Sequence, residues 1–462
     1  MIRPRPPLEA NRAGQPPGLD AATNAILATG AVLVVGLGAL VGLGIAFREP
    51  AALPVLLLGG GLAVLLLSRP EWIVPTFVGI TWAALPGHVF GGLPSPVEVG
   101  GLVLLAFAAW RMLEQPKLAA NVVVIASLLL LPLVASSVLS PEGGSVPIAD
   151  MREVLFLVIV ALAVFGPYGV ERVALALVVV ALFLGLGGIF SVLIGPTDIF
   201  PVVADPEFFV DREAPRAGGP FGEPNFYALS LAALTPLALF VVGQGGWRRS
   251  LGLLVLVAIA GGIMAAGSRG AAIAMLFALV AFAGTTPNRQ LRLAALATVL
   301  VAAALVPLFA SQAGSSATRS VGGRATENLI AAAMVEDHPL VGVGPGTYEA
   351  LYRDYSRDIG NDPRPSREPH SLPLEIAAEQ GIAGVLGWGL AATIVLSYSL
   401  SRGVWRTALG RALVLSTATY LVGSLFLHGS QLRLLFMLVG LVLAYATYLH
   451  EAKLESDRAG LA

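Results

Sequence analysis

The chain has 462 residues, of which 56 % are hydrophobic and 12 % are charged, roughly half the charged fraction of an ordinary soluble domain. The formal net charge is −1, so no global field favours nucleic acid or a strongly charged partner. The absence of cysteine excludes disulfides, zinc–thiolate sites and cysteine nucleophiles. Long apolar runs recur from end to end, which predicts an all-α polytopic membrane protein.

The first 23 residues are polar and rich in Pro and Gly, a composition typical of a disordered tail. The apolar run that follows is too long for a signal peptide and has no clear cleavage site. Because about 20 apolar residues cross a bilayer, we expect membrane helices near 24–47, 51–68, 71–87, 96–113, 119–139, 150–166, 172–195, 225–243, 250–267, 270–285, 291–310, 380–400, 409–427 and 431–450. One pair of short segments is compatible with re-entrant loops, so the prediction is twelve to fourteen spans.

Basic residues in the short connections orient this array. With a cytoplasmic N-terminus, most Arg and Lys of the short loops lie inside, whereas the connections 88–95, 140–149 and 428–430 carry none. The pattern indicates an even number of spans with both termini in the cytoplasm. The two longest connections then lie outside, together with the tight turn "GSRG" at 267–270.

The predicted organisation alternates membrane segments with two outer loops. In chain order these are a tail, an N-terminal membrane half, a first outer loop, a second membrane group, a large outer loop that carries short helices, a C-terminal membrane group and a cytoplasmic tail: 1–23, 24–195, 196–224, 225–310, 311–379, 380–450 and 451–462.

Two arginines stand out near the predicted outer face. Arg216 lies in a Gly-rich loop before a span, and Asn225 follows a proline at the start of that span, where its side chain would cap the helix. An interfacial arginine that reaches lipid headgroups, beside an ordinary cap, explains these two residues equally well. Arg269 lies between two apolar runs, and a cation so close to hydrocarbon usually marks function. The alternative is a turn residue that reaches interfacial water.

The large loop 311–379 holds further polar groups. Arg324 is predicted to open the helix "ATENLIAAAMVED". The glycine spacing in "DHPLVGVGPGTY" (337–348) resembles a nucleotide loop, but no βαβ unit surrounds it. A tight loop packed on the membrane helices is the better interpretation. We interpret His338, which precedes a proline, as structural rather than catalytic.

The same loop ends in "EPHSLPLEIAAEQG" (368–381). Ser371 is placed to cap a helix that runs to Glu379 and stops at Gly381. Glu375 and Glu379 are four residues apart and share a face. His370 stands before the cap, where the helix dipole favours a neutral imidazole, the form that a general base requires. Taken alone, an exposed histidine before a solvated acidic helix explains the stretch better.

Together, these groups indicate a bound anion and a base on one side of the membrane. The planar fork of arginine suits phosphate. The outer loops contain no serine nucleophile elbow and no carboxylate cluster at metal-ligand spacing. The charge of a phosphate leaving group would therefore be neutralised by arginine, and we expect no metal and no cofactor.

At these positions the sequence resembles the O-antigen ligase and O-antigen polymerase superfamily of bacterial envelope enzymes. The resemblance covers roughly residues 200–400, and it is carried by Arg216 with "FGEPN", "GSRG" at 267–270, Arg324, "DHPLVGVGPGTY" at 337–348 and "PHSLPLEIAAEQGIAG" at 369–384. Two departures concern the family's Asp-Pro-Asn, here Glu-Pro-Asn at 223–225, and its His-Asn, here His-Ser at 370–371.

The resemblance implies a multi-pass glycosyltransferase of the C-type architecture in the bacterial cytoplasmic membrane. It would transfer a glycan from an undecaprenyl diphosphate carrier to the hydroxyl of a glycan or lipid acceptor, on the extracytoplasmic face and without metal. Arg216 and Arg269 would grip the donor diphosphate, Arg324 would add a phosphate or sugar contact, and His370 would activate the acceptor. Four further residues rank as secondary: Asn225, His338, Glu375 and Glu379.

Two questions of function stay open at this point. A polymerase would join two carrier-linked repeat units, sharing the donor with a ligase and differing in the acceptor. A transporter or flippase predicts charges at mid-bilayer depth and broken helices in symmetric positions, whereas the polar groups here cluster in outer loops. A purely structural scaffold would not need three arginine sites on one face.

Overall fold

The computed structural model describes residues 69–83, 96–141, 148–164, 166–197, 200, 202–203, 216–293, 295–296, 299, 316–359, 369–427 and 432–459. The chain divides into two compact units, Met1–Ile73 and Val74–Ala462. Of the first unit, the described part is the short 3₁₀ helix η2 (Pro70–Trp72) with the residue on either side. The predicted tail 1–23 and the predicted spans 24–47 and 51–68 lie outside the described residues.

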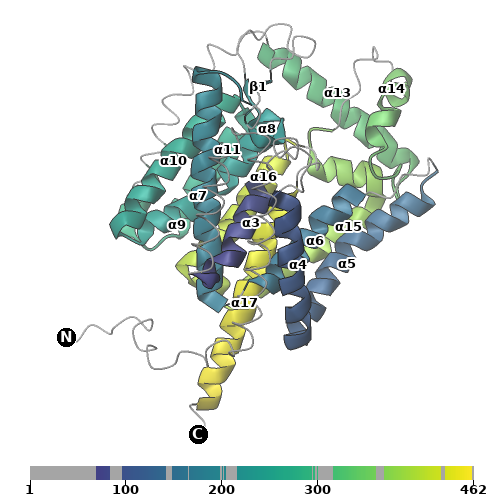
Figure 1. Ribbon diagram of the computed structural model, residues 1–462. Helices are drawn as coiled ribbons and strands as arrows, with labels where there is room; N and C mark the ends of the chain where they lie inside the picture. Colours follow the sequence, from purple (N-terminus) through teal and green to yellow (C-terminus); the bar gives the residue numbers. More distant parts are fainter. Residues whose placement is uncertain are drawn as a thin grey trace, which may run out of the picture. The chain divides into compact units, whose positions relative to one another are not determined.

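The second unit is built almost entirely of helices (Figure 1). They are α3 (Ile73–Ala83, whose first residue belongs to the first unit), α4 (Pro96–Glu114), α5 (Pro116–Leu139), α6 (Ile148–Ala163), α7 (Gly166–Leu193), α8 (Pro224–Ala233), α9 (Thr235–Gly243), α10 (Gly246–Ala266), α11 (Arg269–Thr285), α13 (Ser316–Asp337), α14 (Tyr348–Asp358), α15 (Leu372–Ser401), α16 (Ala408–Ser424) and α17 (Arg433–Ala459). Short elements are η4 (Gly219–Phe221), η5 (Val404–Arg406), and the strands β1 (Val202–Val203) and β2 (Arg216–Ala217), which pair antiparallel.

Within the described residues, six helices are long and apolar enough to cross a membrane: Pro116–Leu139, Tyr168–Leu193, Pro224–Gly243, Gly246–Ala266, Leu372–Ser401 and Arg433–Arg458. Shorter apolar helices occupy Ile73–Trp82 and Arg269–Thr285. This confirms the prediction of an all-α polytopic membrane protein. The predicted total of twelve to fourteen spans depends partly on segments outside the described residues.

Two of the spans are broken, each for a local reason. Pro224–Gly243 divides at Leu234, because Pro236 lacks the N–H and its ring crowds the carbonyl one turn earlier. α15 contains a non-helical residue at Gly381, with φ 61° and ψ −159°, a conformation that glycine adopts at little cost. The predicted stop at Gly381 is therefore a break within one long element.

The helices pack in close pairs, α7 on α10, α6 on α17 and α5 on α15. Small residues make this possible: a Cβ added at Gly185 of α7 would lie 2.5 Å from the carbonyl oxygen of Ala258 on α10. The broken α8–α9 span is the most enclosed, with 94 % of its most apolar window buried. A helix that is apolar all round belongs inside a bundle, and α10, α11 and α16 surround it.

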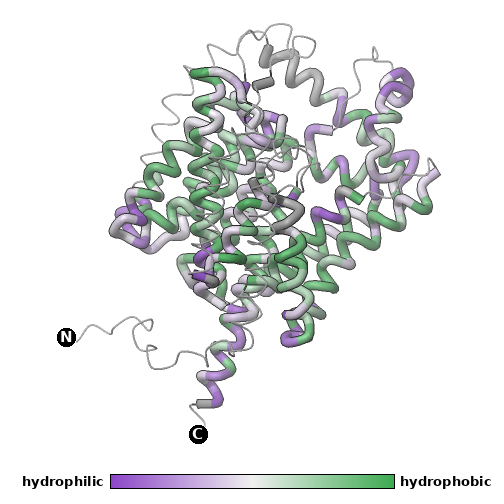
Figure 2. Tube along the Cα trace, viewed as in Figure 1, coloured by the Kyte–Doolittle hydropathy of each residue, from purple (hydrophilic) through white to green (hydrophobic). Residues whose placement is uncertain are grey.

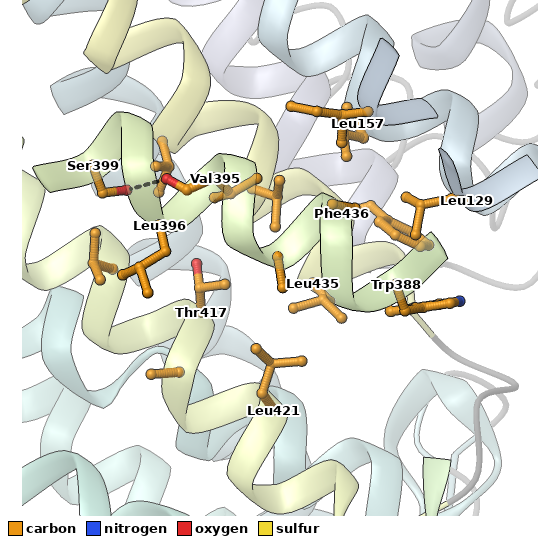
Figure 3. Close-up of a pocket in the computed structure, with 17 residues that line it drawn as sticks. Leu129, Leu157, Trp388, Val395, Leu396, Ser399, Thr417, Leu421, Leu435 and Phe436 are labelled. Atoms are coloured by element: carbon orange, nitrogen blue, oxygen red, sulfur yellow. Dashed lines mark hydrogen bonds between the residues drawn. The ribbon is translucent and has the colours of Figure 1, made fainter. Parts of the chain in front are cut away.

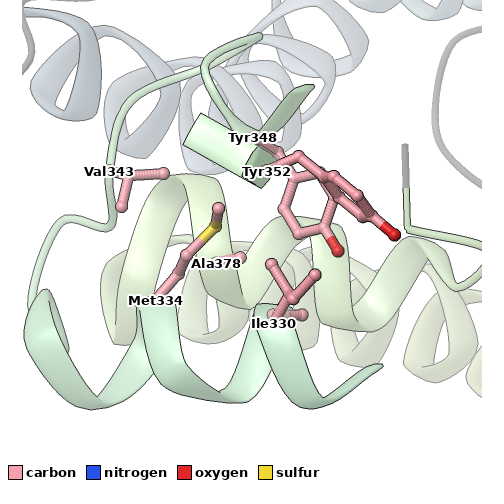
Figure 4. Close-up of a cluster of buried hydrophobic side chains, with 7 residues drawn as sticks. Ile330, Met334, Val343, Tyr348, Tyr352 and Ala378 are labelled. Carbon is pink, nitrogen blue, oxygen red and sulfur yellow. The ribbon is translucent and has the colours of Figure 1, made fainter. Parts of the chain in front are cut away.

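The helices α13 and α14 pack on the first turns of α15. Their shared core consists of Ile330, Ala331, Met334, Val343, Tyr348, Tyr352 and Ala378 (Figure 4). The outer side of α14 is hydrophilic (Figure 2). α13 begins at Ser316, so the prediction that Arg324 opens this helix was wrong, because the glycine pair before Arg324 does not interrupt it.

Candidate functional site

Arg216 joins two segments that lie 50 positions apart in the sequence. Its side chain is 9 % exposed; Nε donates to the carbonyl of Ala266 at 2.7 Å, and Nη2 donates to Oδ1 of Asn225 at 3.2 Å. The guanidinium thus fastens the loop before α8 to the turn between α10 and α11. These two hydrogen bonds of the guanidinium are therefore made to groups of the protein itself.

The start of α8 differs from the prediction that Asn225 caps it. Glu223 is the N-cap, and its side chain accepts from the backbone N–H of Phe226 at 2.7 Å. The proline at position 224 holds the preceding residue in an extended conformation, with φ −128° and ψ 116°, which is the geometry of an N-cap. The amide of Asn225 instead donates to Glu223 at 2.9 Å and accepts from Arg216, so it connects the two.

Arg269 occupies the tight turn that the sequence predicts. Gly267 ends α10 with φ 60°, Ser268 caps α11 by accepting from the N–H of Ala271, and Arg269 is the first residue of α11. Its side chain is exposed, and no hydrogen bond or ion pair ties it within the described part of the chain. A cation beside the positive end of a helix is a favourable place for an anion.

His370 is paired with a carboxylate that the sequence analysis missed. Its Nδ1 lies 2.8 Å from Oε2 of Glu327, whose side chain is 1 % exposed, while the imidazole itself is 26 % exposed. Glu327 lies on the buried stripe of α13 with Ile330, Ala331 and Met334. A carboxylate within an i, i+3, i+4, i+7 apolar pattern was the available signal, since such a group needs a partner.

Tyr348 ties this pair to the next helix. Its hydroxyl donates to the carbonyl of Glu327 at 2.7 Å, and its backbone N–H donates to Oε1 of Glu379 at 3.2 Å. Burial raises the pKa of the Tyr348 hydroxyl, and the negative charge of Glu327 raises it further, so the hydroxyl remains a donor. Because Tyr348 is the first residue of α14, Glu379 satisfies a free N–H at that helix end.

The glycine-rich loop packs on the break in α15, as predicted. The break leaves the carbonyls of Ala378 and Glu379 without their usual partners, and they accept from the N–H groups at 343 and 344, at 2.9 and 3.1 Å. In return, Ile382 and Ala383 donate to the carbonyls at 339 and 340, at 2.8 and 3.2 Å. Four backbone hydrogen bonds therefore hold the loop that follows His338 against α15.

Other predicted residues have simpler places. Ser371 is the N-cap residue of α15, but its side chain makes no capping hydrogen bond. The backbone carbonyl of His338 accepts from the N–H of Gly342 at 3.0 Å, which fits a structural role. Glu375 and Glu379 line one pocket, so they do share a face. Arg324 lies inside α13, and its side chain is outside the described part.

Several predicted residues, with partners that the sequence does not reveal, thus form two groups. The arginine cluster consists of Arg216, Glu223, Asn225 and Arg269; the histidine cluster consists of Glu327, Tyr348, His370 and Glu379. Figure 1 shows β1, α13 and α14 at the end of the bundle opposite the C-terminus. Among the described residues, no three His, Asp or Glu side chains gather closely enough to hold a metal ion.

Comparison with known families places most of these residues in one matched region. Residues 253–389 match the family described as O-antigen ligase. This match supports assignment of the region to the O-antigen ligase and polymerase superfamily. No curated protein matches the chain. The O-antigen ligase region contains Arg269 and the whole histidine cluster, whereas Arg216 and Asn225 precede it.

The match to this family, together with the apolar helices, supports a multi-pass bacterial membrane protein with an activity of the glycan ligase or polymerase type. The O-antigen ligase region begins within α10 and ends within α15. It therefore covers the α10–α11 turn, α13, α14 and the break in α15, which are the elements that hold most of the candidate side chains.

Proposed function

We propose that the protein transfers a glycan from an undecaprenyl diphosphate carrier to an acceptor hydroxyl, on the extracytoplasmic face of the bacterial cytoplasmic membrane. The observation that carries this proposal is the His370–Glu327 pair, a partly exposed imidazole held at 2.8 Å by a buried carboxylate. The pair lies inside the O-antigen ligase region, in which the exposed Arg269 begins α11.

In this proposal, the two ring nitrogens of His370 have different roles. With Nδ1–H donating to Glu327, Nε2 of His370 is left unprotonated to take the acceptor hydroxyl proton. The new bond forms between the acceptor oxygen and the anomeric carbon as the bond to the carrier diphosphate breaks. The imidazolium that results is stabilised by the Glu327 carboxylate, as a carboxylate does for the base of a catalytic triad.

The leaving diphosphate carries growing negative charge, which needs a counter-charge. Arg269 and the free N–H groups at the start of α11 supply it in this proposal. Arg216 acts mainly by fixing the turn that presents Arg269, and Arg324 is proposed as a further donor contact. Because arginine replaces a divalent cation, transfer is expected to persist in the presence of a chelator.

The direct test uses purified protein in lipid vesicles with a carrier-linked glycan and an acceptor. His370→Ala and Arg269→Ala are each expected to lower the transfer rate by at least about a hundredfold, the range that a general base or one stabilising contact contributes. His450→Ala, a change of an exposed histidine near the end of α17, is the matched control. If either test variant transferred glycan at the wild-type rate, the proposal would be wrong.

The choice between ligase and polymerase depends on the acceptor. Deletion of the protein in its host is expected to leave glycan on the carrier. A series of chain lengths on the carrier would identify a ligase, because polymerisation still occurs upstream. A single repeat unit would identify a polymerase.

A further inference from the structure

Two pockets follow one another along α15, and neither is lined by His370 or by a residue of the arginine cluster, although Glu379 of the histidine cluster lines the first. The first, of about 50 Å³, lies between α5, α6, α15 and α17 at the beginning of α15. The second, of about 250 Å³, lies deeper, between the same helices and α16. They share Leu129, Trp388 and Phe436, so one wall is continuous from the first pocket into the second.

The deeper pocket is apolar. Its wall includes Leu157, Leu421 and Leu435, whose side chains point toward one another across it (Figure 3). The two hydroxyl groups of the wall are already satisfied, because Ser399 donates to Val395 at 2.8 Å and Thr417 to Leu413 at 3.0 Å. Such a wall offers nothing to a polar ligand and suits a hydrocarbon chain.

The outer pocket has the opposite character. Four carboxylates line it, from Asp150, Glu153, Glu375 and Glu379, together with the amide of Gln380. Arg433 adjoins this wall, because its Nη2 pairs with Oε1 of Glu153 at 3.1 Å, so the carboxylates outnumber the cation. Glu153 and Gln380 are only 6 % and 8 % exposed. Glu153 Oε2 and Gln380 Oε1 have no hydrogen-bond partner in the described part of the chain. Buried oxygens of this kind need a donor, and the carboxylates disfavour an anion.

The outer pocket is small. A space of about 50 Å³ is large enough for a small polar group such as a single ammonium. Its carboxylates do not form a metal cluster within the described residues. We propose that the two pockets together bind a membrane phospholipid with a primary ammonium headgroup, the ammonium among the carboxylates and one acyl chain in the apolar pocket.

This lipid is distinct from the glycan carrier, whose diphosphate offers no ammonium group to the carboxylates. The inference goes beyond the proposed function and does not rest on it. The site would anchor α5, α6, α15 and α17 to one class of lipid. One of these helices, α15, bears Glu375 and Glu379. It would therefore make the bundle sensitive to the headgroup composition of its membrane.

Trp388 lines both pockets and reports on occupancy. The protein is placed in phosphatidylcholine nanodiscs that contain increasing fractions of either phosphatidylethanolamine or phosphatidylglycerol with brominated chains, which quench tryptophan fluorescence. We expect the ethanolamine lipid to quench at about tenfold lower mole fraction, the preference that one hydrogen bond to a charged group gives. The Trp388→Phe variant is expected to lack this component.

Three variants separate the head and the chain. The double change Asp150→Asn with Glu375→Gln should remove the headgroup preference, whereas Glu336→Gln, at an exposed acid of α13, should keep it. Ala392→Phe, which fills the apolar pocket, should weaken quenching by both lipids. Equal quenching of the wild type by the two lipids, or displacement of the quencher by undecaprenyl phosphate, would overturn the proposal. The transfer assay with His370→Ala reports on the proposed function separately.

Discussion

In the proposed reaction, Glu327 is the residue on which His370 depends most directly. A carboxylate that is 1 % exposed costs several kcal/mol of desolvation unless it is paired. Its partners are the imidazole of His370 at one oxygen and, through the main chain of Glu327, the hydroxyl of Tyr348. The imidazole therefore has a fixed orientation relative to α13, which a loop residue alone would not have.

The Glu327→Gln variant tests this arrangement. The amide keeps the shape but removes the negative charge that stabilises the imidazolium, a charged hydrogen bond of about 1.5–3 kcal/mol. We therefore expect kcat to fall by about 10- to 150-fold, with the KM for the acceptor unchanged. Steady-state kinetics of the purified enzyme measure both. Glu336→Gln on the same helix is the control, and a loss confined to KM would assign Glu327 to substrate binding instead.

The two arginines are expected to differ in kind. Arg216→Lys leaves the carbonyl of Ala266 and the amide of Asn225 without their buried donors, at a cost of about 1–3 kcal/mol in the free energy of unfolding. Arg269→Ala changes an exposed side chain, where the cost is about 0.5 kcal/mol or less. Both variants should transfer glycan slowly, but thermal unfolding in detergent should show a lower Tm only for Arg216→Lys. A lower Tm for Arg269→Ala would contradict its role as a surface contact.

Some of these site residues can be predicted from the sequence, and others cannot. Arg269 and His370 are recognisable because each stands in a short motif beside a helix start that propensity and glycine placement reveal. Glu327 is not, because its partner lies 43 positions away and only the packing of α13 on α15 brings them together. Asn225 is a favourable capping residue by type, but the proline at 224 extends the residue before it, so Glu223 forms the cap.

Among the elements, the contact between the glycine loop and α15 leaves no room for a side chain at one of the loop glycines. Gly342 has φ +70°, and a Cβ there would lie 2.3 Å from the backbone carbon of Glu379. Gly346 has the same φ, but a Cβ there would meet nothing within 4 Å. Any other residue would therefore have the same backbone strain at both positions. The two positions differ only in the neighbour that a side chain would meet.

This difference makes a matched pair of variants. Gly346→Ala should lower the free energy of unfolding by about 1–2 kcal/mol, the cost of a left-handed alanine. Gly342→Ala should cost more and also reduce transfer, because the clash moves the loop away from the segment that begins at His370. Thermal unfolding and the transfer assay measure the two effects. Equal losses from both variants would show that the loop does not rest on α15.

The spans themselves follow from hydropathy, which is why α5, α7, α10 and α17 lie close to their predicted ranges. The breaks at Leu234 and Gly381 are harder to place, because a proline or glycine in a membrane helix often leaves it intact. The start of α13 at Ser316 was missed for the opposite reason, since the glycine pair suggested an end where the helix continues. Local propensity is a weak guide wherever neighbouring elements supply the missing hydrogen bonds.

For the whole molecule, the orientation in the membrane decides whether the proposed chemistry faces the right compartment. Basic residues gather at the connections α9–α10 and α15–α16, where Arg248 pairs with Glu171 and Arg402 lies 4.4 Å from the ring of Tyr398. Because basic connections favour the cytoplasmic side of a membrane, we propose that this end of the bundle faces the cytoplasm. The histidine cluster lies between α13 and the start of α15. It is therefore at the other end of α15 from the basic α15–α16 connection.

Cysteine labelling tests the orientation with little background, because the chain contains no cysteine. Single variants at exposed positions, Glu336→Cys on α13 and Gln244→Cys and Lys453→Cys at the basic end, probe the two faces. A membrane-impermeant maleimide should label Glu336→Cys in intact spheroplasts and the other two only after permeabilisation. The cysteine-free wild type measures non-specific reaction. The reverse pattern would place His370 and Glu327 in the cytoplasm, where they could not meet a glycan carried on the outer leaflet, and the proposed transfer would have to be abandoned even if the His370–Glu327 pair proved essential.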